Sequence, residues 1–143
     1  MIRQLCFAIA ASLLLCVPVT AGQHRINDVT SHEQSMPAVA ASGNKIFVAY
    51  QDTSSWNYDV RLSTSDDGGD TFAPSALAHE PSDQDQWQPA VTADSSGTAF
   101  IVWADYRSGT DFDIYCSSTA DGENFSDSIR VNDVIAGTQI EPA

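Results

Sequence analysis

A repeat with a period of 52 to 53 residues limits the possible folds of this chain more than any other feature. The tripeptide Pro-Ala-Val at 37–39 returns at 89–91, which is 52 residues later (89 − 37). Pro-Ala follows at 142–143, another 53 residues on (142 − 89). Residues 25–29 (Arg-Ile-Asn-Asp-Val) also return, as Arg-Val-Asn-Asp-Val at 130–134. A period of this length indicates one supersecondary unit that is stacked on copies of itself.

Each period contains four short runs of alternating apolar and polar residues, which predicts four β-strands. We expect strands near 36–41, 45–51, 58–64 and 73–79, and again near 88–94, 98–104, 112–118 and 126–131. The predicted fold class is therefore all-β, without helices after the N-terminal apolar run. Four antiparallel strands in a repeat of this size form one blade of a β-propeller.

The repeats predict blade one at about 36–79, blade two at about 88–131 and the start of blade three at about 138–143. Propellers have about 4–8 blades, so two blades and an opening strand do not close a ring. Two explanations remain open: the chain is a fragment of a longer protein, or several copies assemble into one ring.

A turn motif follows the third expected strand of each repeat. In the first repeat it has the pattern Ser-x-Asp-x-Gly-x-Thr-Phe, carried by Ser65, Asp67, Gly69, Thr71 and Phe72. Ser and Asp side chains accept or donate hydrogen bonds to nearby backbone, and Gly adopts a positive φ without a Cβ clash. A degenerate copy is carried by Ser118, Asp121, Gly122 and Phe125, with Ala120 at the position of Asp67. We expect the same turn there, with a weaker side-chain cap.

This motif resembles the Asp-box, or bacterial neuraminidase repeat, of sialidases and other secreted propellers. The resemblance covers nearly all of residues 22–143 and implies a partial six-bladed propeller, in which the boxes are folding elements and not catalytic ones. The alternative for the carboxylates Asp66, Asp67 and Asp70 is a calcium site. Their spacing does not match an EF-hand loop, so no metal site is assigned.

The first 21 residues are typical of a secretory signal peptide. Arg3 is followed by an apolar run at 5–17 and by the small residues Val-Thr-Ala at 19–21. We expect cleavage after Ala21 and a secreted or periplasmic protein. Cleavage removes two of the three cysteines and leaves Cys116, so no intrachain disulfide is expected. The alternatives for Cys116 are a buried strand thiol or pairing between chains.

The strongly acidic composition excludes some partners. The formal net charge is −13, and loss of Arg3 with the signal peptide makes it −14. Such a surface repels nucleic acid and anionic membranes. No phosphate-binding glycine loop, nucleophile elbow or spaced histidine pair is present, so no cofactor is expected.

Candidate binding residues gather at one end of the predicted blades. In a meander, the loops between strands two and three and between blades share the end opposite the boxes, and loops on a rigid scaffold often carry binding groups. Those loops contribute the candidate binding residues Arg25, Asp52, Trp56, Trp87, Asp105 and Arg107. Asp105 and Arg107 could orient a polar ligand, and Trp56 or Trp87 could stack on a sugar ring. The alternative is a scaffold role, because Asp52 and Asp105 recur at one blade position.

The resemblance to sialidases implies hydrolysis of glycans. Members of that family bind the substrate carboxylate with three arginines and use a Tyr–Glu pair and an Asp. Only Arg25 corresponds in position to a family arginine, in Arg-Ile-Asn and not Arg-Ile-Pro. Because no other catalytic position has a match, no catalytic residue is assigned. The sequence therefore indicates part of a secreted sialidase-like glycoside hydrolase, inactive until later blades complete it; the alternative is a propeller module that binds extracellular glycans or proteins.

Overall fold

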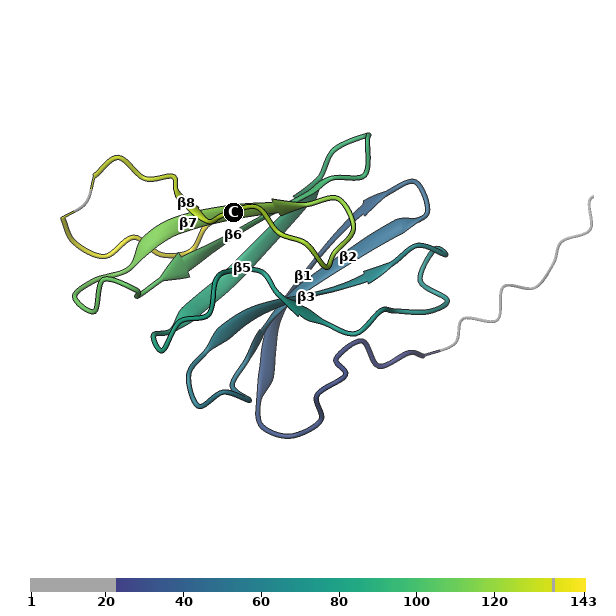
Figure 1. Cartoon of the computed structure of the whole chain (residues 1–143), viewed down its shortest axis with the longest axis horizontal. Coiled ribbons are helices and arrows are strands. Elements are labelled where there is room, and N and C mark those ends of the chain that lie inside the picture. Colours follow the sequence, from purple (N-terminus) through teal and green to yellow (C-terminus); the bar gives the residue numbers. More distant parts are fainter. Residues whose placement is uncertain (1–22, 135) are drawn as a thin grey trace, which may run out of the picture.

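The computed structural model describes residues 23–134 and 136–143, which form two four-stranded antiparallel sheets (Figure 1). The first sheet, blade 1, consists of β1 (Gln34–Ser42), β2 (Lys45–Asp52), β3 (Asp59–Ser65) and β4 (Ala76–Leu77). The second sheet, blade 2, consists of β5 (Gln86–Ala93), β6 (Ala99–Asp105), β7 (Asp113–Thr119) and β8 (Ile129–Arg130). The expected all-β fold of two four-stranded blades is confirmed. The expected signal peptide, residues 1–21, lies outside the described residues.

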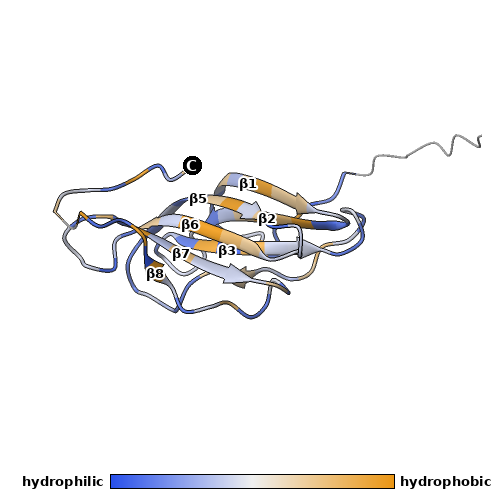
Figure 2. Ribbon diagram, turned by 90° about the horizontal axis from the view of Figure 1, so that it is seen from above, coloured by the Kyte–Doolittle hydropathy of each residue, from blue (hydrophilic) through white to orange (hydrophobic). Residues whose placement is uncertain are grey.

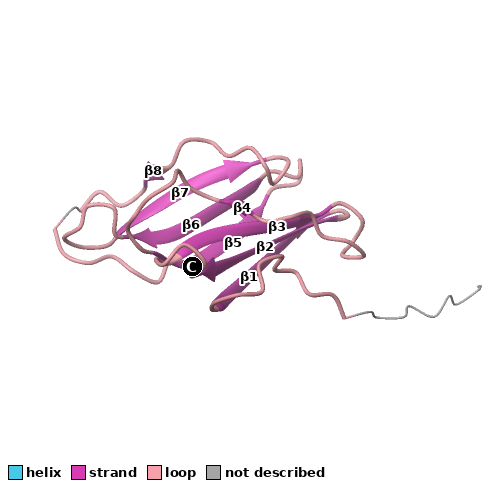
Figure 3. Cartoon of the chain, turned by 60° about the horizontal axis from the view of Figure 1, so that its bottom comes forward, coloured by secondary structure: helices cyan, strands magenta, loops and turns pink. Residues whose placement is uncertain are grey.

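Both blades are simple meanders in which each strand pairs with the next one in sequence. The inner three strands lie within a few residues of the expected ranges. The fourth strands, however, are two residues long, where six or seven were expected. They pair only at Arg61↔Leu77 with Leu62↔Ala76 in blade 1, and at Tyr115↔Arg130 with Cys116↔Ile129 in blade 2. The residues before them are irregular, although the backbone amides of Ala73 and Ser126 already donate to the carbonyls of Thr64 and Ser118 on the third strands. Within the described residues the chain otherwise consists of turns and loops (Figure 3).

The loops divide between two ends of the sheets. At one end, the backbone amide of Gly68 in the turn after β3 donates to the carbonyl of Asn44 in the β1–β2 turn, at 2.9 Å. At the opposite end, the side-chain amide of Asn57 in the β2–β3 loop donates to the backbone carbonyls of Ser82 and Gln84 in the segment between the blades. The first end is called the turn end and the second the loop end.

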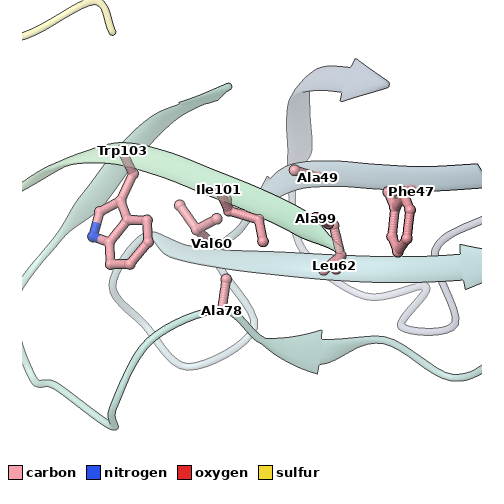
Figure 4. Packing of buried hydrophobic residues seen from close by; sticks show 8 residues of the cluster. All are labelled: Phe47, Ala49, Val60, Leu62, Ala78, Ala99, Ile101 and Trp103. Atoms are coloured by element: carbon pink, nitrogen blue, oxygen red, sulfur yellow. The ribbon is translucent and has the colours of Figure 1, made fainter. Parts of the chain in front are cut away.

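The hydrophobic core lies between the two blades. The side chains of β2 and β3 that face blade 2 are Phe47, Ala49, Val60 and Leu62, each no more than 1% exposed. They pack with Ala78 against Ala99, Ile101 and Trp103 of β6 (Figure 4). Burial of each large side chain here stabilises the fold by about 1.5–3 kcal/mol. The hydrophobic colouring in Figure 2 accordingly lies mainly on the strands, and the loops are mostly hydrophilic.

The outward face of blade 2 has no such cover within the described residues. Phe100 on β6 occupies the register position that Phe47 has on β2, because Phe47 pairs with Ala40 and Thr64, and Phe100 with Thr92 and Ser118. Phe47 is 1% exposed, whereas Phe100 is 39% exposed. Ile129 and Val131 on the same face are also exposed. The open face of blade 2 therefore corresponds to the face of blade 1 that packs against blade 2.

Candidate functional site

A residue with a positive φ directly before proline recurs in each repeat, and in the first two repeats it lies at a bulge of the first strand. The β1–β2 register shifts between Ser35 and Ala38, and the β5–β6 register shifts between Trp87 and Ala90. Met36, Gln88 and Glu141, each directly before a proline, have positive φ values of 51°, 54° and 60°. A side-chain-bearing residue in this region costs about 1 to 2 kcal/mol. Strain of this kind persists where the surroundings impose it, and bulges are frequent beside active sites.

The three X-Pro elements line one hollow near the loop end. Its volume is about 330 Å³, and it is lined by Met36, Pro37, Gln88, Pro89, Glu141 and Pro142. We call it the axial hollow, because the X-Pro-Ala element at the start of each repeat contributes to it. The side-chain carbonyl of Gln51 accepts the amide of Gln88 at 2.8 Å, and that of Gln88 accepts the amide of Glu141 at 2.9 Å. These two bonds link successive repeats around the hollow.

Of the residues that line the hollow, none was a candidate in the sequence. Propensity does not favour a left-handed residue before proline, so the bulges could not be foreseen. The available signal was the recurrence of X-Pro-Ala at the repeat period, at 36–38, 88–90 and 141–143. An X-Pro-Ala element that returns once per blade on the innermost strand must face its copies near the centre.

Asp52 and Asp105 end β2 and β6 as buried, hydrogen-bonded carboxylates. Asp52 is 0% exposed and accepts from the amide of Gln34 and from the backbone of Ser54. Asp105 is 1% exposed and accepts from the Trp103 indole and from the backbone and guanidinium of Arg107. Burial raises the pKa of Asp105, but the hydrogen bonds from Arg107 and Trp103 outweigh it and hold the pKa below its usual range. Neither carboxylate is free to contact a ligand.

The Arg107 guanidinium is fully engaged within the protein. It makes two hydrogen bonds to Asp105, at 3.0 and 2.7 Å, and its Cζ lies 3.9 Å from the centre of the Tyr115 ring. Glu80, from the segment between the blades, lies 3.6 Å from its other nitrogen. A guanidinium held in this way ties the inter-blade segment to blade 2, and its Nε–Nη2 edge is already occupied by Asp105 and cannot hold a substrate carboxylate.

The two candidate tryptophans lie in different surroundings. Trp87 on β5 packs against Phe112 and Tyr58, with ring centroids 4.8 and 5.7 Å apart, and is therefore a packing residue. Trp56 lies in the β2–β3 loop, has a positive φ of 76° and is 91% exposed. Its only aromatic neighbour within the described residues is His32, at 5.6 Å. Trp56 is the candidate that remains available to stack on a ligand.

Arg25 is exposed and precedes β1 on the segment that returns at 130–134. It does not line the axial hollow. Its counterpart Arg130 lies on the outermost strand of blade 2, near Asp113 at 3.8 Å.

In the first turn motif, Ser65 and Asp67 hold the backbone. The Ser65 hydroxyl accepts from the amide of Gly69 and donates to Asp67, which also accepts from the amide and hydroxyl of Thr71. The Thr71 and Ser65 hydrogen bonds lower the pKa of Asp67 well below its usual range. Phe72 follows the capped residues, and the chain reaches β4 at Ala76.

The second turn motif uses a different hydroxyl from the one expected. Thr119, and not Ser118, caps the amide of Gly122, at 2.9 Å. Ser118 still belongs to β7 and bonds Ser126 instead. Asp121 accepts from the Thr119 hydroxyl and from three nitrogens of Glu123 and Asn124, which is one bond more than Asp67 accepts, so the expectation of a weaker side-chain cap is wrong. This turn is one residue shorter, and the missing residue lies after the aspartate. Phe125 packs against the core.

No metal or membrane-spanning element emerges from the described residues. Between 23 and 134 and between 136 and 143, no group of three or more His, Cys, Asp or Glu side chains is arranged to hold a metal ion. In the same part of the chain no helix has the length and apolar character to cross a membrane.

The comparisons with known proteins bear on the fold. No protein-family model matches the sequence, and no curated protein is similar to it. Among solved structures, a Hadza microbial sialidase matches with a TM-score of 0.56 and 19% identity, over 68% of this chain and 25% of the sialidase. An α-L-arabinanase from Penicillium chrysogenum, solved with arabinobiose, matches with a TM-score of 0.55 and 21% identity, over 82% of this chain and 36% of the arabinanase.

The matched region spans a quarter to about a third of those solved chains. At such identities the likeness concerns the fold alone. The two four-stranded meanders, packed face to face, account for the match, and this chain has the β-propeller fold of these glycoside hydrolases.

Proposed function

We propose that this chain provides consecutive blades of an exported, sialidase-like propeller that acts on glycans, with the ligand bound at the axial hollow. The observation that carries the proposal is the convergence of three strained X-Pro elements, from three successive repeats, on one hollow. Backbone strain that recurs in every repeat and always borders the same hollow is best explained by a ligand that binds in that hollow.

The chemistry of the hollow suits a sugar. Gln88 offers an amide and Glu141 a carboxylate, both of which hydrogen-bond hydroxyl groups, while Met36 and the three prolines form apolar walls. Trp56 does not line the hollow itself, but it is exposed on a loop at the same end of blade 1, where a glycan that extends from the hollow would meet its flat ring. Polar groups that converge beside apolar walls are typical of small-ligand pockets.

Catalysis would require residues from other blades. Arg25 lies apart from the hollow, and Arg107 is engaged by Asp105 and Tyr115, so neither is free to hold a substrate carboxylate there. We therefore expect the 143-residue chain to bind glycans weakly without cleaving them. A propeller module that only binds glycans is the second candidate, favoured by the lack of a free guanidinium among the residues that line the hollow.

Glycan binding by the purified chain tests the site. We expect Glu141→Ala and Trp56→Ala each to raise the dissociation constant about tenfold, because each removes one main contact. Glu123→Ala, which removes an exposed carboxylate at the turn end, is the matched control and should bind like the parent. Equal losses for all three variants, or none for the first two, would contradict the proposed site.

Turnover separates the two candidates. The complete propeller should release the fluorophore from a fluorogenic sialoside if it is an enzyme, and should bind the same compound unchanged if it is a binding module. If neither the chain nor the complete propeller bound any glycan, both candidates would be wrong. Export is tested separately by the N-terminal sequence of the mature protein, which we expect to begin at Gly22.

A further inference from the structure

One position of the repeat holds a histidine where the other two copies hold an asparagine. Asn27, His79 and Asn132 are one repeat period apart, 52 residues (79 − 27) and 53 residues (132 − 79). His79 and Asn132 also have the same place on their sheets. The residue before each, Ala78 or Val131, donates its amide to the third strand of the blade at 2.9 Å.

Asn132 shows what an asparagine does at this position. Its side-chain oxygen accepts from the backbone amide of Ile114 at 2.7 Å, and its side-chain nitrogen donates to the Asp113 carboxylate at 2.7 Å. The same nitrogen also donates to the side chain of Gln139 at 3.2 Å. An amide serves a donor and an acceptor at the same time, because its oxygen and its nitrogen are separate atoms.

His79 faces the equivalent groups of blade 1 with a single atom. Its Nε2 accepts from the backbone amide of Val60 at 3.3 Å and lies 3.6 Å from the carboxylate of Asp59. Its Nδ1 lies 2.8 Å from the carbonyl of Glu80. Because a carbonyl only accepts, Nδ1 carries the hydrogen and the free lone pair of the neutral ring is on Nε2. In this form Nε2 serves Val60 and cannot donate to Asp59.

Gln86 shows a second consequence of the histidine. It lies one period from Gln34 (86 − 34 = 52) and from Gln139 (139 − 86 = 53), whose side-chain oxygens accept from the two asparagines at 3.2 Å. Gln86 is 0% exposed, and in the part of the chain that the structure describes neither its side-chain oxygen nor its nitrogen has a hydrogen-bond partner. His79 therefore does not replace the asparagine in its hydrogen bonds.

His79 lies at the contact between the two blades. Its side chain is 0% exposed, and its ring lies 5.9 Å from that of Trp103 on β6. The residues on either side of it hold blade 2. The carbonyl of Ala78 accepts from the hydroxyl of Ser117 at 2.5 Å, and the carboxylate of Glu80 accepts from the hydroxyl of the residue directly before β8 at 2.6 Å. A change in the hydrogen bonds of this ring therefore acts on the junction.

The charged groups around the ring come from β3, from β6 and from the segment itself. Asp59 on β3 is 5% exposed and faces Nε2. On β6, Trp103 contacts the ring and donates to Asp105, whose charge is paired with Arg107. Glu80, next to the histidine in sequence, lies 3.6 Å from the same guanidinium. Asp59 is therefore the carboxylate that a proton on Nε2 meets.

We propose that His79 is a proton-dependent joint between the blades. A proton can be added to the neutral ring only at Nε2, and histidine is the side chain whose charge ordinarily changes between about pH 5 and 8. The neutral ring accepts the Val60 amide. The protonated ring donates Nε2–H to Asp59 and releases that amide. Acidification thus exchanges a hydrogen bond within blade 1 for an ion pair, at the segment that contacts blade 2.

NMR of the intact chain between about pH 8 and 5 tests this exchange. The ring nitrogens of His79 report its protonation, and the hydrogen-exchange protection factor of the Val60 amide reports the bond to the ring. We expect this protection factor to fall about tenfold as the ring gains its proton, because the amide loses its acceptor. The Ile114 amide, bonded to Asn132 at the equivalent place, is the internal control and should keep its protection.

His79→Asn installs the residue of the other two copies. The Val60 amide of this variant should keep its protection over the whole pH range. His32→Asn, which changes an exposed histidine away from the junction, is the matched control and should retain the fall at Val60. A fall that persisted in His79→Asn would overturn the proposal. So would a His79 ring that stayed neutral to pH 5, or one that gained a proton without any change at Val60.

The reciprocal substitution covers the case in which His79→Asn does not fold. Asn132→His places a histidine against Ile114 and Asp113 of blade 2, so the Ile114 amide should acquire the pH dependence of Val60. If the Ile114 amide of this variant stayed fully protected at pH 5, the proposal would be wrong. Each of these measurements is made without a glycan, so they test the joint separately from the proposed function.

Discussion

At Gly122 the backbone of blade 2 approaches a side chain of blade 1 closely. It lies in the second turn motif with a φ of +79°, and a Cβ at this position would meet the Cγ2 of Thr64 on β3 at 2.3 Å. Gly109, in the β6–β7 loop, has a similar φ of +71° with nothing within 4 Å of the same position. The two glycines share a backbone requirement but not a contact between blades.

Alanine substitutions separate these two effects. Gly109→Ala should cost about 1 to 2 kcal/mol, the penalty for a left-handed alanine. Gly122→Ala should cost the same penalty and about 1 to 3 kcal/mol more, because the methyl group overlaps Thr64. Urea denaturation measures both. In the double variant Thr64→Ala with Gly122→Ala, most of the extra cost should disappear; equal costs for the two single variants would contradict the packing described.

Single residues also show where inference from sequence stops. Asp105 and Arg107 were expected to be able to hold a ligand, and their types and spacing allow it, but the structure pairs them with each other. The sequence does not distinguish Trp87 from Trp56 as a surface for a ligand. In the structure, Phe112 packs against Trp87 from a distant position in the sequence, and only Trp56 is highly exposed. Side-chain partners of this kind depend on tertiary packing, which no local pattern contains.

At the scale of elements, Glu80 joins the segment after β4 to the segment before β8. Its carboxylate accepts the amide and the hydroxyl of Ser128, both at 2.6 Å. Burial raises the pKa of Glu80, but the two Ser128 hydrogen bonds outweigh it and lower the pKa to about 2. The equivalent pair on the other side of blade 1 is Asp28 with Ser75. A carboxylate–serine clasp is therefore present in front of the fourth strand of both blades.

The clasp makes stability depend on pH. The pKa of Glu80 is lower in the folded state than in the unfolded chain, so its contribution is complete above about pH 4.5 and is lost as the pH falls toward 2. Glu80→Gln should therefore destabilise the chain at pH 7 and flatten the loss of stability between pH 4.5 and 2. Denaturation at several pH values measures this. Asp66→Asn, on a side chain that is 80% exposed, should retain the parent slope; an unchanged slope in Glu80→Gln would refute the clasp.

Equivalent phenylalanines on β2 and β6 test how the blades pack. Phe47→Ala should cost about 3–5 kcal/mol, because it leaves a cavity between the blades. Phe100→Ala should cost much less, about 1 kcal/mol, since its ring is 39% exposed on the open face. Equal losses of unfolding free energy would show that the face of blade 2 is covered, or that Phe47 is not.

The strands themselves could be predicted because each strand pattern occurs twice in the sequence, once in each repeat. Turn residues and apolar alternation located the second and third strands of each blade, β2, β3, β6 and β7, to within about one residue. The bulges at Met36 and Gln88 could not be located, because they require a left-handed residue before proline against local preference. The axial hollow, which depends on those bulges, was therefore outside the reach of the sequence pattern.

At the scale of the whole molecule, the open face of blade 2 determines behaviour in solution. Phe100, Ile129 and Val131 expose 39%, 62% and 51% of their surface there. Contiguous apolar surface of this kind favours association. We expect the chain to self-associate as its concentration rises and Phe100→Lys to reduce this, as measured by light scattering. Trp56→Lys, which removes an exposed ring at a loop, should have little effect on self-association. A larger effect of Trp56→Lys than of Phe100→Lys would mean that the chains associate through a surface other than the open face of blade 2.

The central claim is that the two repeats pack on each other as consecutive blades of a propeller. Solution NMR measures this most directly, through the nuclear Overhauser effect between the Thr64 methyl group and the α-protons of Gly122, which lie in different blades 58 residues apart (122 − 64). The account predicts a strong cross-peak, together with cross-peaks between Trp103 and Val60 across the core. Two well-ordered sheets without these contacts would mean that the blades do not pack, and the propeller account of this chain would be wrong.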